Sequence, residues 1–226
     1  MGIFNKLTLI SLLDITGIST VGTGNVDNTF VWKLAILAGI VIVSYKLVGL
    51  VFRGDIMTVI ETERLYIDEV TEEEIQEVIE IESHKENRDY LWIGTVEEHK
   101  AEIADPNHML LIFHEKESGE TKGYALIRLN FKSHIFEIRR IAITDKGKGY
   151  GKESMIALIR YAFEETETNR LWLDVYPDNE IGIKLYESLG MHCDGVLRQN
   201  YLAERGYLDQ IIYSLLRCEY ETFRHM

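Results

Sequence analysis

The stretch Ile138 to Lys152, IRRIAITDKGKGYGK, decides the fold that this chain is expected to adopt. It begins with residues typical of a β-strand and breaks into a turn with glycines at positions 147, 149 and 151. An amphipathic helix pattern follows, with apolar residues at 155, 158, 159, 162 and 163. A strand, a glycine turn and a helix start gather free backbone N–H groups at the positive end of a helix dipole, where phosphate binds.

A second segment, Arg170 to Gly190, reads as a buried strand, a turn and a short helix that glycine ends. Asn179 and Tyr186 are seven residues apart, so they lie on one face of that helix. From these residues alone, the simpler interpretation is that Asn179 caps the helix and Tyr186 packs in the core.

Together the two segments resemble the GNAT superfamily of acyl-CoA-dependent N-acetyltransferases. Its first motif, Gln/Arg-x-x-Gly-x-Gly/Ala, reads here KGKGYG from Lys146 to Gly151. Its second, Asn-x-x-Ala-Ile/Val-x-Leu-Tyr-x-x-x-Gly-Phe, reads NEIGIKLYESLGM from Asn179 to Met191. The departures are Lys146, Gly182 and Met191. They are mild, although a lysine offers a point charge where arginine offers a planar fork.

The resemblance covers about Val59 to Tyr220 and implies an α/β fold, the GNAT fold, over residues 57–226. Its central sheet would be mixed, mostly antiparallel and splayed between the fourth and fifth strands, with helices on both faces. We expect a first strand over Val59 to Asp68, and capping boxes at Thr71 and Thr95 predict two helix starts. Further strands are expected over residues 109–114, 123–130, 134–143, 170–175 and 207–216.

The resemblance also implies acetyl-CoA as co-substrate and a place for each part of it. Its pantetheine arm would lie in the gap between the splayed strands and pair with the backbone at Ile141 and Ile143. Asn179 would orient that arm, and Tyr186 would protonate the departing thiolate. A backbone N–H near Ile141 would stabilise the oxyanion. The residues expected to bind its pyrophosphate are Lys146, Gly147, Lys148, Gly149, Tyr150, Gly151 and Lys152.

The candidate general base is Glu137, which lies four residues before Ile141 and would share its face of the strand under a period of two. The alternative is that Glu137 forms an ion pair with Arg139 or Arg140. We expect no metal site, because the two cysteines form no Cys-x-x-Cys motif and belong to no ligand-like cluster.

The formal net charge of −13 argues against a nucleic-acid partner, because phosphate contacts need a basic face. It favours a cationic acceptor, although ordinary acidic solubility explains it equally well. The segment Asp194 to Gln210 resembles the branch that includes ribosomal-protein alanine and serine acetyltransferases and spermidine acetyltransferase. This implies a small amine, a polyamine or a peptide amino terminus as acceptor, read by residues 83–90 and 200–206. The resemblance also allows a homodimer.

Residues 1–56 read as a separate extension. Leu34 to Phe52 is nineteen residues long with one charge, Lys46, and it predicts a hydrophobic transmembrane helix within about residues 30–52. The lysines and arginines that flank it place the catalytic domain in the cytoplasm, anchored to the cell membrane. The alternatives are a buried helix, or an upstream extension of an enzyme that itself starts at Met57. A different class of function is a membrane-tethered acyl-CoA sensor that does not catalyse, and the presence of Tyr186 favours the enzyme.

Overall fold

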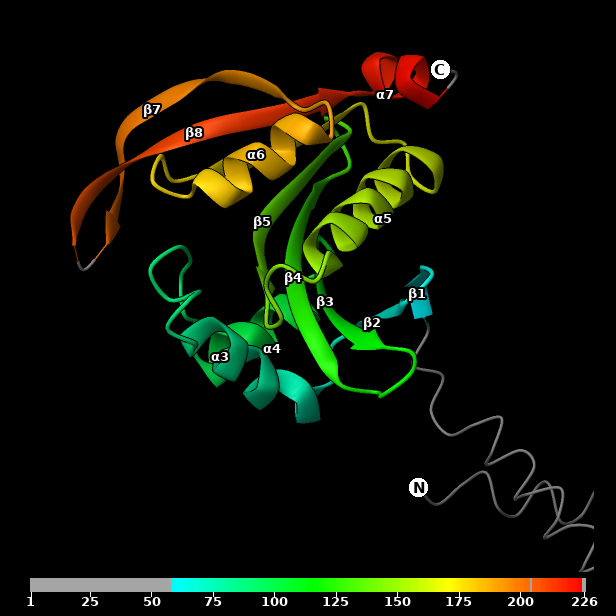
Figure 1. The fold of residues 1–226 in the computed structure, drawn as a ribbon, viewed down its shortest axis with the longest axis vertical. Coiled ribbons are helices and arrows are strands. Elements are labelled where there is room, and N and C mark those ends of the chain that lie inside the picture. Colours follow the sequence, from blue (N-terminus) through cyan, green and yellow to red (C-terminus); the bar gives the residue numbers. More distant parts are fainter. Residues whose placement is uncertain (1–57, 204, 225–226) are drawn as a thin grey trace, which may run out of the picture. The chain divides into compact units, whose positions relative to one another are not determined.

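Residues 58–203 and 205–224 of the 226-residue chain are described by a computed structural model (Figure 1). The candidate membrane helix at about residues 30–52 and the expected domain boundary after residue 56 lie outside these residues. Both therefore stay predictions. Among the helices of the described residues, none combines the length and the apolar character needed to cross a membrane.

The centre of the fold is an eight-stranded sheet in the order β1–β2–β3–β4–β5–β6–β8–β7. Neighbouring strands are antiparallel except β5 and β6, which run parallel, so the sheet is mixed and mostly antiparallel, as expected. The strands are β1 (Thr58–Glu61), β2 (Leu65–Glu69), β3 (His108–Glu115), β4 (Thr121–Asn130), β5 (Ile135–Ile143), β6 (Arg170–Val175), β7 (His192–Ala203) and β8 (Gly206–Leu216).

Helices cover both faces of this sheet (Figure 1). They are the 3₁₀ turn η1 (Glu72–Glu74), α3 (Ile75–Ser83), α4 (Val96–Ala104), α5 (Tyr150–Glu164), α6 (Glu180–Ser188) and α7 (Arg217–Arg224). One buried cluster joins the sheet to α5 and α6 through side chains such as Leu158 and Tyr186. A second joins the opposite face to α3 through Val78 and Ile81. Both capping boxes are present, and at Thr95 the hydroxyl accepts the N–H of Glu98 at 3.2 Å.

Two expectations about the strands are wrong. The single strand expected over Val59 to Asp68 is two antiparallel strands, β1 and β2. They separate because the Thr62 hydroxyl accepts the Leu65 N–H at 2.8 Å, a local bond that competes with extended backbone. The second is β7, which was not expected as a strand. It is an edge strand whose side chains are mostly exposed, so its sequence lacks the alternation that reports a buried face.

The parallel pair β5 and β6 separates part of the way along its length. The strands pair only over Ile135–Ile138 and Arg170–Leu173, although β5 continues to Ile143 and β6 to Val175. The splay expected between the fourth and fifth strands is therefore present between β5 and β6, because the family's first strand is split here into two.

A buried carboxylate attaches α3 to the sheet and to the start of α4. The Glu82 side chain is fully buried and accepts the backbone N–H of Gly94 at 2.7 Å and the hydroxyl of Tyr124 at 2.6 Å. Arg140 on β5 donates to the same carboxylate at 3.0 Å. These bonds hold the pKa of Glu82 below its usual value, although burial alone would raise it.

His99 on α4 completes this network. Its ring is fully buried, with Nδ1 2.8 Å from Glu102 and Nε2 3.3 Å from Glu82. Burial alone would lower the pKa of His99, but hydrogen bonds to the two carboxylates raise it to about 9. The ring is therefore protonated at neutral pH, and both nitrogens donate.

We expect this network to make folding stability depend on alkaline pH. The pKa of His99 rises from about 6.5 in the unfolded chain to about 9 in the folded protein, so its contribution is complete below about pH 6.5 and lost as the pH rises through 9. The contribution amounts to about 3 kcal/mol at most. Urea unfolding of the parent and of His99→Gln should differ at pH 6.5 and converge near pH 9.5. His84→Gln, an exposed histidine, is the control, and a constant difference across this range would contradict the expectation.

Candidate functional site

A cavity of about 990 Å³ lies where β5 and β6 separate. Its walls come from these two strands, the start of α5, the N-terminal part of α6, and the segment that joins α3 to α4. This volume is at the upper end of the range for cavities that bind cofactor-sized ligands. The expected site residues that line it are Glu137, Ile141, Ile143, Lys146, Gly147, Gly149, Gly151, Asn179 and Tyr186.

One end of the cavity is formed by the glycine turn before α5. Gly147 and Gly149 have φ of 76° and 86°, the left-handed region that a side chain resists, and Gly149 is the N-cap residue of α5. The first N–H groups of a helix have no partner within the helix, so they are available to an anion here. Lys146 donates to the backbone carbonyl of Glu86 at 2.7 Å, which ties the turn to the segment between α3 and α4.

The remaining residues expected to bind pyrophosphate do not line the cavity. Lys148 and Lys152 are exposed. Tyr150 is buried, its hydroxyl donates to Glu115, and its ring lies under the guanidinium of Arg64, 4.4 Å from the ring centroid. The part of the turn that lines the cavity is therefore mostly glycine backbone, together with Lys146.

The middle of the cavity follows a strand edge that has lost its partner. Beyond Ile138, β5 no longer pairs with β6, so the backbone from Arg139 to Ile143 presents unpaired groups on that side. Ile141 and Ile143 lie in this stretch and line the cavity. An extended chain bearing amide groups could pair here as an added strand.

The helix α6 brings Asn179 and Tyr186 to the same cavity. The side chain of Asn179 accepts the N–H of Gly182 at 3.0 Å, so Asn179 is the N-cap of the helix as the simpler interpretation held. Tyr186 is buried and packs against Tyr213, with ring centroids 6.1 Å apart. Burial, and after it the charge of Asp174, raises the pKa of Tyr186 to about 12. The phenol is therefore protonated at neutral pH.

Glu137 lines the cavity, and it is paired. Its carboxylate lies 2.5 Å from Arg128 and 3.8 Å from Arg139, so one of the two arginines named by the alternative interpretation is a partner. The other, Arg140, instead binds Glu82 and Glu102.

The expectation that Glu137 shares a face with Ile141 is wrong. A bulge leaves Arg139 unpaired, because Ile138 pairs with Ile127 while Arg140 pairs with Leu126. Ile138 and Ile141 consequently pack in the same core cluster beneath α5, which a strict period of two forbids. Glu137 therefore faces the α3 side of the sheet.

Sequence reasoning missed Asp174, near the carboxyl end of β6. It lines the cavity and accepts a hydrogen bond from Gln210, which in turn accepts one from Asn200 at 2.5 Å. No cation lies within ion-pair distance of it among residues 58–203 and 205–224. Burial raises its pKa, and the charge of Glu137 adds to this effect. The available signal was a lone carboxylate that alternates with the buried Leu173 and Val175.

Comparison with known proteins identifies the family to which this chain belongs. A sequence profile described as "Acetyltransferase (GNAT) domain" matches residues 64–192, more than half of the chain. A protein called "Uncharacterized N-acetyltransferase p20" from Bacillus licheniformis is 38% identical over 74 residues, which are 33% of this chain and 42% of that protein. This chain thus matches less than half the length of that relative.

Two solved structures share the fold. A GNAT-family acetyltransferase from Bacillus anthracis superposes with a TM-score of 0.61 at 21% identity, covering 71% of this chain and 99% of that one. Spermidine N-acetyltransferase from Vibrio cholerae, in complex with CoA and spermine, gives a TM-score of 0.64 at 16% identity, covering 71% and 99%. With the profile match over the strands and helices that build the cavity, these findings show that this chain belongs to the GNAT acetyltransferase family.

Proposed function

We propose that this protein is an acetyl-CoA-dependent N-acetyltransferase that transfers the acetyl group to a primary amine by direct attack in a ternary complex. The observation that carries the proposal is the meeting, in one cavity, of an anion-binding turn, an unpaired strand edge and a buried tyrosine. Family membership supports it.

The cavity residues fit the parts of acetyl-CoA. The pyrophosphate would lie against the backbone of Gly147 and Gly149, with Lys146 beside it. The pantetheine amides would pair with the free edge of β5 at Ile141 and Ile143. Bound there, the co-substrate supplies an activated acyl group, and the remaining chemistry belongs to side chains of this protein.

The transfer needs a neutral amine and a proton for the leaving sulfur. A carboxylate takes a proton from the incoming ammonium, and the nitrogen lone pair then forms the C–N bond while the C–S bond breaks. The Tyr186 hydroxyl donates its proton to the sulfur, and the proton that leaves the acylated nitrogen restores the phenol. A backbone N–H near Ile141 stabilises the negative charge that develops on the carbonyl oxygen.

Two carboxylates compete for the role of base. The carboxylate of Glu137 is already engaged in ion pairs with Arg128 and Arg139, so it is less free to accept a proton from the amine. Asp174 has a raised pKa, and the side chain that donates to its carboxylate is the neutral amide of Gln210. A base whose pKa lies nearer the working pH accepts a proton more effectively, so we place Asp174 ahead of Glu137.

The acceptor end of the cavity favours a cation. Besides Asp174, it is lined by the aromatic rings of Tyr176 and Tyr201, and residues from both loops expected to read the acceptor contribute to the wall. Carboxylates together with aromatic faces suit an ammonium group. A small amine, a polyamine and a peptide amino terminus all present one.

Gly149→Ala should weaken acetyl-CoA binding. An alanine at φ 86° is strained by about 1–2 kcal/mol, so the turn rearranges and the N–H groups leave the anion. Gly119→Ala is the matched control, because Gly119 has φ 72° but lies in a turn that does not line the cavity. Isothermal titration calorimetry should show weaker affinity for Gly149→Ala alone. Equal affinities in folded proteins would refute the cofactor site.

Tyr186→Phe keeps the ring packing and removes the proton donor. We expect turnover to fall about 10²–10⁴-fold while acetyl-CoA affinity changes little. Thiol release should be followed at saturating acetyl-CoA with spermidine and with peptides that begin with alanine or serine. The proposed acid role fails if the variant turns over close to the parent rate. An acyl-CoA sensor would bind acetyl-CoA and turn over none of these amines.

The pH dependence of kcat/KM in variants of the two carboxylates can show which of them is the base. If Asp174 is the base, kcat/KM rises as the pH passes its raised pKa, and Asp174→Asn removes this rise and lowers kcat about 10²-fold or more. Glu137→Gln should keep the rise but move it to lower pH, because the charge of Glu137 raises the pKa of Asp174. The groups near Asp174 that also titrate or carry charge are Glu137, Arg139, Tyr176, Tyr186 and Tyr201. The opposite pattern in the two variants would assign the base to Glu137.

A further inference from the structure

We propose that Arg64 is a positioning residue for the phosphate turn, which it serves by holding the Lys148 carbonyl so that the Gly149 N–H points into the cavity. This inference rests on the proposed function, because it concerns how the same turn binds pyrophosphate. Arg64 lies in the turn between β1 and β2, far in sequence from the two family motifs at residues 146–151 and 179–191.

The direction of the Gly149 N–H follows from the geometry of one peptide bond. Arg64 donates through Nη1 to the carbonyl oxygen of Lys148 at 3.1 Å. In a trans peptide the C=O and the following N–H point in opposite directions, and no cis peptide occurs among the described residues. The N–H of Gly149 therefore points away from Arg64. Gly149 lines the cavity, whereas Arg64 and Lys148 do not, so this direction leads into the cavity.

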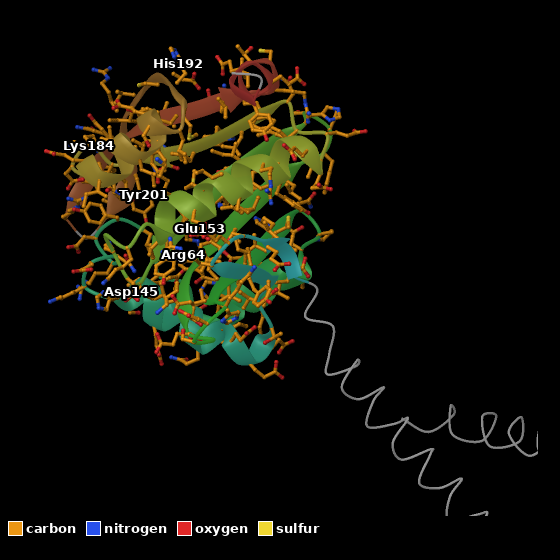
Figure 2. All side chains as sticks on the ribbon, turned by 45° about the vertical axis from the view of Figure 1, so that its right-hand side comes forward. Arg64, Asp145, Glu153, Lys184, His192 and Tyr201 are labelled. Carbon is orange, nitrogen blue, oxygen red and sulfur yellow. The ribbon has the colours of Figure 1, made fainter. Side chains whose placement is uncertain are left out.

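Arg64 is itself held rigidly against the first turn of α5. Its Nε and Nη2 lie 2.7 and 2.6 Å from one oxygen of Glu153. The other oxygen of Glu153 accepts the backbone N–H of Arg64 at 2.9 Å and the hydroxyl of Thr62 at 2.6 Å. Figure 2 shows Arg64 and Glu153 next to each other where the β1–β2 turn meets α5. These bonds thus hold the β1–β2 turn against the start of α5.

The guanidinium also packs on the turn itself. It stacks on the ring of Tyr150, and its Nη2 lies 3.3 Å from where a Cβ of Gly149 would stand. A planar fork can bind a carboxylate on one edge, a carbonyl on the other and an aromatic ring on its face, which a lysine ammonium cannot do together. Since Glu153 neutralises its charge, Arg64 acts on the turn through orientation.

The test uses two ligands, acetyl-CoA, which carries the pyrophosphate, and acetyl-pantetheine, which lacks it. Arg64→Gln should bind acetyl-CoA about tenfold more weakly, the loss that one misdirected charge-assisted hydrogen bond produces. It should bind acetyl-pantetheine, which has no pyrophosphate, as the parent does. Arg64→Lys should resemble Arg64→Gln although it keeps the charge. Calorimetry measures acetyl-CoA, and ligand-observed NMR measures the weaker acetyl-pantetheine.

The control is Arg160→Gln, which removes an arginine of α5 whose guanidinium donates to the backbone carbonyl of Glu61 in β1. It should bind both ligands normally. The inference is overturned if Arg64→Gln keeps parental acetyl-CoA affinity, if both ligands weaken equally, or if Arg64→Lys behaves as the parent. Failure of the proposed function is distinguishable, because then the parent itself would not bind acetyl-CoA.

Discussion

The incomplete pairing of β5 and β6 is the constraint on which the rest of the site depends. Backbone N–H and C=O groups in a protein interior need partners, and a parallel pair that stops at Ile138 and Leu173 leaves two strand edges without them. In this chain the gap between the two edges is a cavity, which we propose as the binding site. The glycine turn closes one end of the gap, α6 forms a wall, and a ligand with amide groups can satisfy the free edge.

The gap stays open because both of its sides are fixed to other parts of the fold. On one side, Arg140 holds the bulged part of β5 to the buried carboxylate of Glu82 and thus to α3 and α4. On the other, Gln210 of β8 holds Asp174 at the end of β6. Neither attachment crosses the gap. A cavity held open in this way needs little rearrangement before a ligand enters, so less conformational entropy is lost on binding.

The sequence predicts those features of the site that depend on neighbours along the chain. The glycine turn, the Asn179 cap and the capping box at Thr95 are each contained in a few consecutive residues. The bulge at Arg139 and the hydrogen bond of Gln210 to Asp174 depend on pairing between strands distant in sequence. Local patterns carry no information about such pairing. The face of Glu137 was therefore mispredicted, and Asp174 was missed altogether.

The burial of Tyr186 limits how it would deliver a proton as the proposed acid. A phenol with a pKa of about 12 is a far weaker acid than a thiol in water, whose pKa is near 8.5, and the difference corresponds to roughly 5 kcal/mol against complete transfer. A free phenolate is therefore disfavoured in this cavity. In the proposed reaction, proton return from the acylated nitrogen to the phenol would therefore accompany cleavage of the C–S bond. Under that proposal the protons would move in a cycle, and the tyrosine would emerge from each turnover unchanged.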